Sequence, residues 1–291
     1  MEFLRPASWE EALAAKAGLP GALPVQGGTD VMVELNFDVR RPPAVLDLNR
    51  VAELAEWELD GGWVRLGAAV PYSRIVEELS GPLPGLALAA RTVGSPQIRN
   101  RGSVGGNLGA ASPAGDAHPA LLAAGRGVRV EAHSVRGVRL IPIDEFFVGV
   151  KRNCLAPDEL IRAVRIPVAD GPQQFSKVGT RNAMVIAVCA FALALHPRER
   201  TVGTGIGSAA PTPRRAERAE EFLREVLVWE SPAPPAEGVV RRFGELVAAA
   251  ADPIDDVRGT AAYRRHALAV LARRSLTWCW SEYGERLGRA A

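Results

Sequence analysis

Cysteine, strong charge and long apolar runs are all scarce in this 291-residue chain. The three cysteines, Cys154, Cys189 and Cys279, lie far apart and form no CxxC pair. A structural zinc site or an iron–sulfur cluster usually needs about four ligands, so neither is expected here. Free thiols of this kind fit a reducing cytoplasm. The longest apolar stretch, residues 183–195, is well short of the ~20 residues of a transmembrane helix, so no membrane span is expected.

The charge balance excludes further classes of protein. The chain has 35 basic and 33 acidic residues, which leaves a formal net charge of +2. Nucleic-acid-binding domains generally carry a marked basic excess, so no nucleic-acid partner is expected. The N-terminal sequence MEFLRPASWEEA has no apolar run before a cleavage site, which predicts no signal peptide and a cytoplasmic location.

Periodicity and turn residues predict a first part with mixed helices and strands. Ser8 and Glu11 form a capping-box pattern for a helix that ends near Gly18. The sequence Asp60-Gly61-Gly62 between two apolar segments is typical of a hairpin turn. Strands are expected at residues 23–25, 44–48, 56–59, 63–66, 128–132, 138–141 and 159–166, and helices at residues 73–79 and 86–90.

The turn-forming sequence at residues 169–172 (ADGP) is the strongest boundary signal in the chain. We therefore expect one domain over residues 1–170 and a second, smaller α+β domain over residues 171–291, with an antiparallel sheet followed by helices. The second domain has expected strands at residues 175–178, 183–195 and 203–208, helices at 216–227, 239–250 and 261–280, and a stiff connector at 231–235. The cluster Trp278-Cys279-Trp280 is expected to face the core from the last helix.

Two glycine-rich loops are candidates for phosphate binding. Residues 26–30 (QGGTD) follow a short apolar strand, and residues 103–107 (SVGGN) lie in a stretch rich in Gly, Ala and Ser. Paired glycines let a phosphate approach backbone N–H groups closely. Short polar side chains in and near these loops suit phosphate or sugar hydroxyls. Neither loop matches GxGxxG or GxxxxGK[ST], and each loop taken alone is more typical of a simple turn.

Three motifs in order carry a family resemblance. Residues 93–100 (VGSPQIRN), 102–107 (GSVGGN) and 111–116 (ASPAGD) resemble the FAD-binding medium subunit of carbon monoxide dehydrogenase and its relatives. They are also similar to the flavin domain of xanthine dehydrogenase. Residues 27–30 match the family's first flavin loop, and residues 207–214 and 263–265 resemble parts of its C-terminal domain. The resemblance covers nearly the whole chain.

This resemblance implies a fold and a set of cofactor contacts. The fold is a two-subdomain FAD-binding domain of the p-cresol methylhydroxylase/vanillyl-alcohol oxidase type, followed by the smaller α+β domain. FAD would lie extended, with its diphosphate between the two glycine loops. One loop would contribute Pro24, Val25, Gln26, Gly27, Gly28, Thr29 and Asp30, and the other Ser103, Gly105, Gly106 and Asn107. Val93, Gly94, Ser95 and Ile98 would lie near the isoalloxazine ring or a phosphate, Ser112 and Asp116 would hold ribityl or adenosine-side hydroxyls, and Leu160 and Ile161 would pack on the cofactor. At Gln26 relatives more often carry a small or apolar residue.

Lys177 falls where some relatives place a lysine near the pyrimidine edge of the flavin. A cation there would stabilise negative charge at N1 and C2=O of the reduced flavin and raise its reduction potential. The alternative is a solvated lysine at a strand end. Arg181 is a weaker candidate for the same neighbourhood. The histidines form no metal or triad pattern, so no metal site and no catalytic residue are expected, and His118 is interpreted as structural.

The implied function is that of an FAD-dependent oxidoreductase subunit. Electrons would pass from a molybdenum centre, through two [2Fe–2S] clusters of a partner, to this FAD and then to an external acceptor such as NAD⁺, a quinone or oxygen. The chain lacks cluster ligands and is too short for the molybdenum domain. An iron–sulfur small subunit and a molybdopterin large subunit are therefore the expected partners, in a heterotrimeric complex that dimerises. Two alternatives stay open: a stand-alone FAD-dependent oxidoreductase acting on a small molecule, and a scaffold that has lost flavin.

Overall fold

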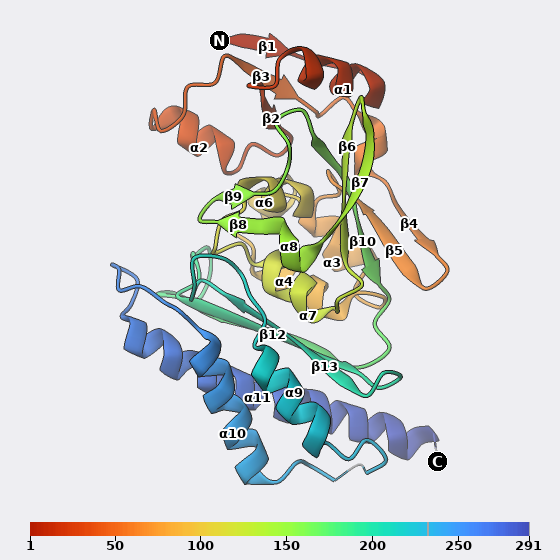
Figure 1. The fold of residues 1–291 in the computed structure, drawn as a ribbon, viewed down its shortest axis with the longest axis vertical. Coiled ribbons are helices and arrows are strands. Elements are labelled where there is room, and N and C mark those ends of the chain that lie inside the picture. The colour runs from red at the N-terminus through yellow and green to blue at the C-terminus, as the bar shows by residue number, and fades with distance from the viewer. Residues whose placement is uncertain (232, 291) are drawn as a thin grey trace.

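The computed structural model describes residues 1–231 and 233–290, and its parts are stacked along the long axis of the molecule (Figure 1). At the N-terminal end lies a small parallel sheet of order β1-β3-β2. Its strands are β1 (Glu2–Leu4), β2 (Leu23–Val25) and β3 (Ala44–Asp47), and nearby are the helix α2 (Val31–Asn36) and the 3-10 helix η1 (Ala52–Ala55). Residues 31–35, which are apolar in sequence, thus lie in a helix.

The helix α1 (Trp9–Gly18) packs against this sheet through Trp9 and Ala12. Its first turn has the N-cap half of the predicted capping box. The Ser8 Oγ accepts a hydrogen bond from the Glu11 N–H at 3.2 Å, and the Glu11 carboxylate accepts one from the Ala7 N–H at 2.7 Å. The first bond satisfies a backbone donor that a helix start leaves without an intrahelical partner. The second bond reaches Ala7, one residue before the N-cap, and not the Ser8 N–H that a capping box would use.

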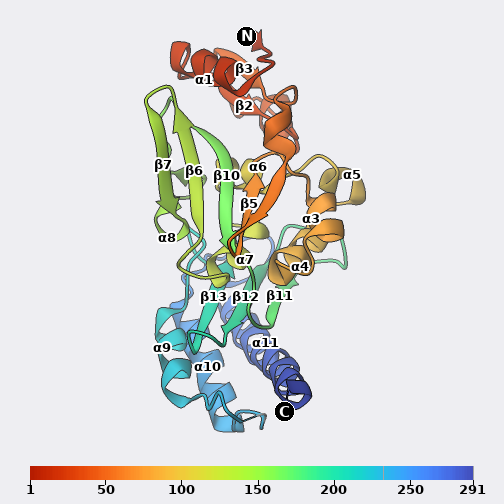
Figure 2. The same cartoon turned by 90° about the vertical axis from the view of Figure 1, so that its right-hand side faces the viewer.

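A five-stranded antiparallel sheet of order β4-β5-β10-β6-β7 forms the middle of the molecule. Helices lie along one face of it (Figure 2). The strands of the sheet are β4 (Trp57–Asp60), β5 (Trp63–Gly67), β6 (Arg129–Ser134), β7 (Gly137–Pro142) and β10 (Leu160–Pro167). The helices of this region are α3 (Tyr72–Glu78), α4 (Pro84–Thr92), α5 (Pro96–Arg99), α6 (Val104–Ala110), α7 (Ala117–Ala123) and α8 (Ile143–Phe146). A separate two-stranded sheet is formed by β8 (Phe147–Gly149) and β9 (Arg152–Asn153). The predicted hairpin at residues 56–66 is confirmed, because Asp60 pairs with Trp63 across Gly61 and Gly62, whose φ angles are 53° and 85°.

The C-terminal part is a three-stranded antiparallel sheet followed by helices. Its elements are β11 (Gln173–Val178), β12 (Cys189–His196), β13 (Thr201–Gly207), α9 (Glu217–Val226), α10 (Glu237–Ala250) and α11 (Ala261–Ala290). The strand expected over residues 183–195 is wrong in its first half, since the ladder starts at Cys189. In the preceding segment Met184 has a φ of 50°, and the Val185 carbonyl accepts from the side chain of Lys177 instead of from a strand.

Two further expectations concern the C-terminal helices. The connector at residues 231–235 includes residue 232, which lies outside the described residues. The last helix runs ten residues beyond its expected end, to Ala290. Cys279 and Trp280 are buried as predicted, but the prediction for Trp278 is wrong, because its side chain is 46% exposed. Successive helical residues point about 100° apart, so on a helix with one exposed face Trp278 and Trp280, about 200° apart, do not both face the core.

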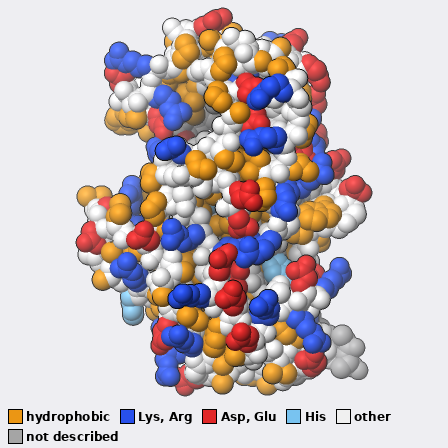
Figure 3. All heavy atoms as spheres, viewed as in Figure 1, with side chains coloured by type: hydrophobic (Ala, Val, Ile, Leu, Met, Phe, Trp, Pro, Cys, Tyr) orange, Lys and Arg blue, Asp and Glu red, His pale blue; other side chains and the backbone are white. Residues whose placement is uncertain are grey.

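Acidic and basic side chains are interspersed over the face seen in Figure 3, in keeping with the small net charge. None of the helices described combines the length and apolarity needed to cross a bilayer. Within residues 1–231 and 233–290, no group of three or more His, Cys, Asp or Glu side chains is placed to hold a metal ion.

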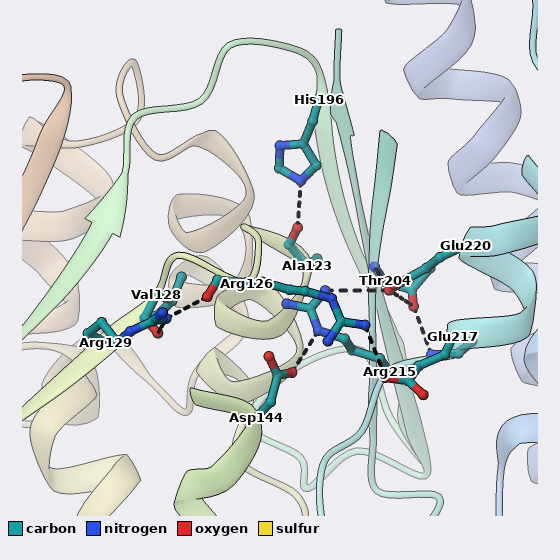
Figure 4. Close-up of polar contacts among 11 residues, drawn as sticks. Ala123, Arg126, Val128, Arg129, Asp144, His196, Thr204, Arg215, Glu217 and Glu220 are labelled. Atoms are coloured by element: carbon teal, nitrogen blue, oxygen red, sulfur yellow. Dashed lines mark hydrogen bonds and ion pairs between the residues drawn. The ribbon is translucent and has the colours of Figure 1, made fainter. Parts of the chain in front are cut away.

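The two parts meet where α7 packs against β12 and β13. The side chains of Ala190, Ala192 and Ala194 join the core of the first part, whereas Phe191 and Leu193 on the opposite face join the core under the C-terminal helices. Polar contacts flank this junction (Figure 4). The buried Arg215 pairs with Asp144 at 2.7 Å and Glu220 at 3.4 Å, and the His196 Nε2 lies 3.1 Å from the Ala123 carbonyl oxygen. Small residues and ion pairs therefore join the two parts closely.

Candidate functional site

A cavity of about 680 Å³ opens where the two glycine-rich loops meet. Figure 3 shows the surface hollowed beneath the lobe that carries α2, which contributes Val31 and Glu34 to the cavity wall. Most of the predicted cofactor residues line it: Pro24, Gln26, Gly27, Gly28, Thr29, Asp30, Val93, Gly94, Ser95, Ile98, Ser103, Gly105, Gly106, Asn107, Asp116, Leu160 and Ile161. Val25, Ser112 and Lys177 do not line it. The Ser112 hydroxyl accepts from the Ala114 N–H at 3.3 Å and so stabilises its own turn.

The first glycine loop lies directly against the segment that leads into the second. A Cβ atom on Gly27 would stand 2.2 Å from the Arg101 carbonyl oxygen, so only glycine fits there. The Arg101 Nη2 donates to the Gln26 carbonyl at 3.3 Å and to the Asn49 side chain at 2.8 Å. Gly28 has a φ of 74°, which permits the turn from β2 into α2. Close backbone packing thus joins two loops that are far apart in the sequence.

The second glycine loop is the first turn of α6. Ser103 caps this helix, and its Oγ accepts from the Gly106 N–H at 3.1 Å. The two glycines have different surroundings. A Cβ on Gly105 would lie 2.4 Å from the Ala68 carbonyl oxygen, whereas a Cβ on Gly106 would meet only the Ser103 Oγ, at 3.3 Å. Gly105 therefore permits packing within the fold, and Gly106 leaves open space at the cavity wall beside the N–H groups of the first turn.

Several polar atoms of the cavity wall are buried without a hydrogen-bond partner in the described part of the chain. They are Gln26 Oε1, Tyr72 OH, Asn107 Oδ1 and Asp116 Oδ1. Buried polar atoms nearly always have partners in native proteins, since an unmade hydrogen bond costs free energy. Three oxygen acceptors and one phenol beside two glycine loops suit a ligand that has hydroxyl or amide donors together with phosphates. The residues present fit FAD on these grounds.

Asp116 and Lys177 form a buried ion pair at the cavity wall. The Lys177 Nζ lies 2.6 Å from the Asp116 Oδ2, and the two side chains are only 10% and 9% exposed. Burial raises the pKa of the Asp116 carboxyl, and the Lys177 ammonium opposes this rise. The interpretation of Lys177 as a solvated lysine is therefore wrong. The position of Lys177 near the pyrimidine edge of the flavin stays a prediction. Arg181 folds back on its own loop and donates to the carbonyls of Ala183 and Met184.

Some residues of the cavity wall carried no signal in the sequence. Tyr72 starts a helix in a loop-rich region, and Lys16 lies on α1 among alanines. The Lys16 Nζ donates to the carbonyls of Pro20 and Ala22, and burial lowers its pKa. Leu48 and Leu54 line the same region, next to the small parallel sheet. These side chains come together only through packing of distant segments, so no local pattern could have identified them.

His118 lies in α7, with its ring centroid 4.6 Å from that of Phe147, and it does not line the cavity. Burial lowers the pKa of His118 to about 4, opposed in part by the backbone of Asn107 and Ser112. The unfolded chain therefore binds this proton more readily than the folded chain. Stability is present above the ordinary histidine pKa and is lost as the pH falls toward 4.

We expect acidification to destabilise the native protein more than the variant His118→Leu. Between pH 7 and pH 4 His118 takes up a proton more readily in the unfolded chain than in the folded one. This difference should lower the unfolding free energy of the native protein by about 3 kcal/mol. The variant lacks this term, and urea titrations of both proteins at several pH values measure the difference. Parallel pH profiles for the two proteins would contradict the assignment of a neutral buried imidazole.

Both parts of the chain are similar to known flavin-binding proteins. The family model described as the FAD binding domain in molybdopterin dehydrogenase matches residues 1–169. The model described as the CO dehydrogenase flavoprotein C-terminal domain matches residues 174–279. The chain is 29% identical to the xanthine dehydrogenase FAD-binding subunit of Escherichia coli O157:H7, over 98% of each chain. It is 31% identical to the nicotine 6-hydroxylase medium subunit of Paenarthrobacter nicotinovorans, over 95% of this chain and 96% of the relative.

A solved structure has the same fold over nearly the whole length. It is carbon monoxide dehydrogenase from Hydrogenophaga pseudoflava in a form that lacks the Mo-pyranopterin moiety of the molybdenum cofactor. The TM-score is 0.88 at 26% sequence identity, and the match covers 97% of this chain and 98% of the other. The likeness therefore extends to both parts of the molecule.

Proposed function

Since the chain belongs to the family of FAD-binding subunits of carbon monoxide and xanthine dehydrogenases, we propose that it carries electrons from a partner subunit, through FAD, to an external acceptor. Membership of the family, FAD as cofactor and the two-part α+β fold are confirmed. The observation that supports the proposed site most directly is the meeting of the two glycine loops. Gln26 and Arg101, 75 positions apart in sequence, are hydrogen-bonded where the loops touch, and both loops line one cavity.

In this proposal the chain's own residues hold and orient the cofactor. The backbone of residues 24–30 and the first turn of α6 would hold the diphosphate, because helix starts and glycine loops present free N–H groups to anions. Asp116 would accept from a hydroxyl, and Leu160 and Ile161 would pack on the cofactor. Val93, Gly94, Ser95 and Ile98 would lie near the isoalloxazine ring. Leu23, Leu48 and Leu54, at the end nearest the small parallel sheet, offer an apolar lining suited to the adenine ring.

The bound flavin supplies the redox chemistry, and the protein contributes binding, orientation and electrostatics. The polar atoms without partners along the cavity wall would bind donors of the cofactor and exclude water from those positions. This assignment gives none of the chain's side chains a proton-transfer role in the electron-carrier function.

We propose further that residues 1–170 and 171–291 are the two domains, and that the partners are an iron–sulfur small subunit and a molybdopterin large subunit. The name "medium subunit" of the nicotine 6-hydroxylase relative supports an assembly with further chains. We propose a heterotrimeric complex that dimerises and acts in the cytoplasm.

The visible spectrum of the purified chain tests the cofactor assignment. We expect flavin absorption bands, and FAD as the flavin released on denaturation. In the complex with its iron–sulfur and molybdopterin subunits, we expect reducing substrate to bleach these bands only when the iron–sulfur subunit is present. A colourless chain that takes up no added FAD would contradict the binding site. Direct oxidation of a small molecule by the isolated chain would contradict the electron-carrier role.

A further inference from the structure

Lys177 reaches from the C-terminal part of the molecule into the wall of the cavity. It lies on β11, and its Nζ donates to the Asp116 Oδ2 at 2.6 Å, the Thr92 carbonyl at 2.9 Å and the Val185 carbonyl at 3.2 Å. An ammonium group has three N–H donors, so all of them are used within the protein. The cation therefore has no donor left for a bound flavin in this arrangement.

Each of the three acceptors belongs to a segment that lines the cavity. Asp116 and Val185 line it directly, and Thr92 immediately precedes the lining residues Val93 and Gly94. Lys177 itself lies behind this wall. It thus holds together the end of α4, the start of α7 and the segment between β11 and β12.

Asp116 uses its two oxygens differently. The Oδ2 accepts from Lys177, and it lies 3.3 Å from the Thr92 hydroxyl, which has a nearer acceptor in the Ala89 carbonyl at 2.8 Å. The Oδ1 is buried and has no partner in the described protein. A carboxylate fixed through one oxygen presents the other as a strong acceptor in a defined direction.

We propose that Lys177 is a positioning residue for the flavin: it holds Asp116 as an oriented carboxylate whose Oδ1 accepts from a hydroxyl of the cofactor. This inference rests on the proposed function. It also makes FAD binding depend on the docking of the C-terminal domain, because Lys177 lies on that domain while Thr92 and Asp116 lie on the first. It assigns Lys177 a different role from a cation that contacts the pyrimidine edge of the flavin directly.

The surroundings of Asp116 make the charge of Lys177 necessary. Tyr72 on α3 is neutral, because burial and the charges of Asp116 and Asp30 raise its pKa well above the usual value. His118 on α7 is neutral at pH 7, because burial lowers its pKa to about 4. Thr92 carries no charge and offers Asp116 only a hydroxyl. Without Lys177 the buried carboxyl would face neutral groups, and its pKa would rise further.

The test is a titration of the apoprotein with FAD between pH 6 and pH 9, followed by flavin fluorescence. We expect Lys177→Met to weaken FAD binding by roughly tenfold or more at pH 7, as for loss of a hydrogen bond to a charged group. The loss should be larger at pH 6 than at pH 9, because a raised Asp116 pKa leaves the carboxyl protonated at the lower pH. Asp116→Asn should weaken binding without this added pH dependence. The double variant Lys177→Met/Asp116→Asn should bind no more weakly than Asp116→Asn alone.

Two further variants complete the test. Arg215→Met breaks another ion pair at the junction of the two parts, in which the arginine is buried and Asp144 is partly exposed. This pair lies away from the cavity, so the variant should leave the pH profile of FAD binding unchanged. Should Lys177→Met not fold, Lys177→Gln is neutral but can still donate to carbonyls, and it carries the same expectation.

Native-like FAD affinity in the Lys177 variant would overturn the inference. So would a loss that is independent of pH and additive with that of Asp116→Asn, since either result indicates a merely structural lysine. If the native chain itself fails to bind FAD, the proposed function is wrong, and this outcome is distinct from a failure of the variants alone.

Discussion

Replacing Gly106 with leucine is expected to weaken FAD binding by at least ~100-fold while the apoprotein stays folded. Gly106 lies in the first turn of α6 and is exposed to solvent, and a Cβ atom added to it would have only the Ser103 Oγ within 4 Å. A leucine side chain there would occupy the space assigned to the diphosphate. A factor of ~100 corresponds to about 3 kcal/mol, which is the loss of one or two hydrogen bonds to a charged group.

A substitution at the neighbouring Gly105 would not distinguish an effect on FAD binding from an effect on folding. A Cβ on Gly105 would stand 2.4 Å from the Ala68 carbonyl oxygen, so any substitution there strains the fold itself. Gly238→Leu is a matched control. Gly238 lies in the first turn of α10, has no atom of residues 1–231 or 233–290 within 4 Å of its Cβ position, and does not line the cavity. Equilibrium titration with FAD and thermal unfolding of both apoproteins provide the two measurements. A Gly106→Leu protein that binds FAD within about threefold of the native affinity would rule out the assigned diphosphate position.

Adding a single methyl group at Gly205 is expected to destabilise the protein by about 3 kcal/mol, the upper end of the usual cost of overpacking a core. Gly205 lies on β13 against α7, and its Cβ would stand 2.1 Å from the Pro119 carbonyl oxygen. The obstacle is backbone, so relief requires the helix and the sheet to move apart. The alanines of β12 on the same face show that this junction admits only small side chains.

Thermal unfolding followed by circular dichroism measures this effect. A loss of this size should lower the Tm of this 291-residue chain by roughly 5 °C, because the entropy of unfolding grows with chain length. Gly81→Ala is the control, because no atom lies within 4 Å of its Cβ position, and it should change the stability by no more than about 0.5 kcal/mol. Equal Tm values for Gly205→Ala and the native chain would show that the helix and sheet can separate at little cost.

Much of the secondary structure could be predicted because its signals are local. The N-cap at Ser8 and the paired glycines of the hairpin at residues 61–62 each act on backbone within a few positions. The segment at residues 183–188 could not be predicted in this way. It is as apolar as the strand that follows, but its carbonyls accept hydrogen bonds from the side chains of Lys177 and Arg181. A competing side-chain donor on a neighbouring strand has no signature in the apolar pattern itself.

The residues of the candidate site also fall into those that local sequence signals identify and those that depend on tertiary packing. The glycine loops were identified because a missing Cβ or a positive φ is a property of one residue, and the structure brings both loops to one cavity. Tyr72 and Lys16 were missed because their place in the wall depends on how distant segments pack. Lys177 was identified by its position, but its pairing with Asp116, 61 positions away, was not foreseen.

The sequence by itself determined where paired glycines leave the backbone open, most of the segments that form strands and helices, and which family it resembles. These properties follow from steric limits and periodicity that act within a few residues. Only the tertiary structure decided that the two loops touch, that α7 lies against glycines of β13, and that the Lys177 cation is neutralised by Asp116 behind the cavity wall. Burial and ion pairing depend on distances between segments remote in the chain, and those distances exist only once the cores have formed.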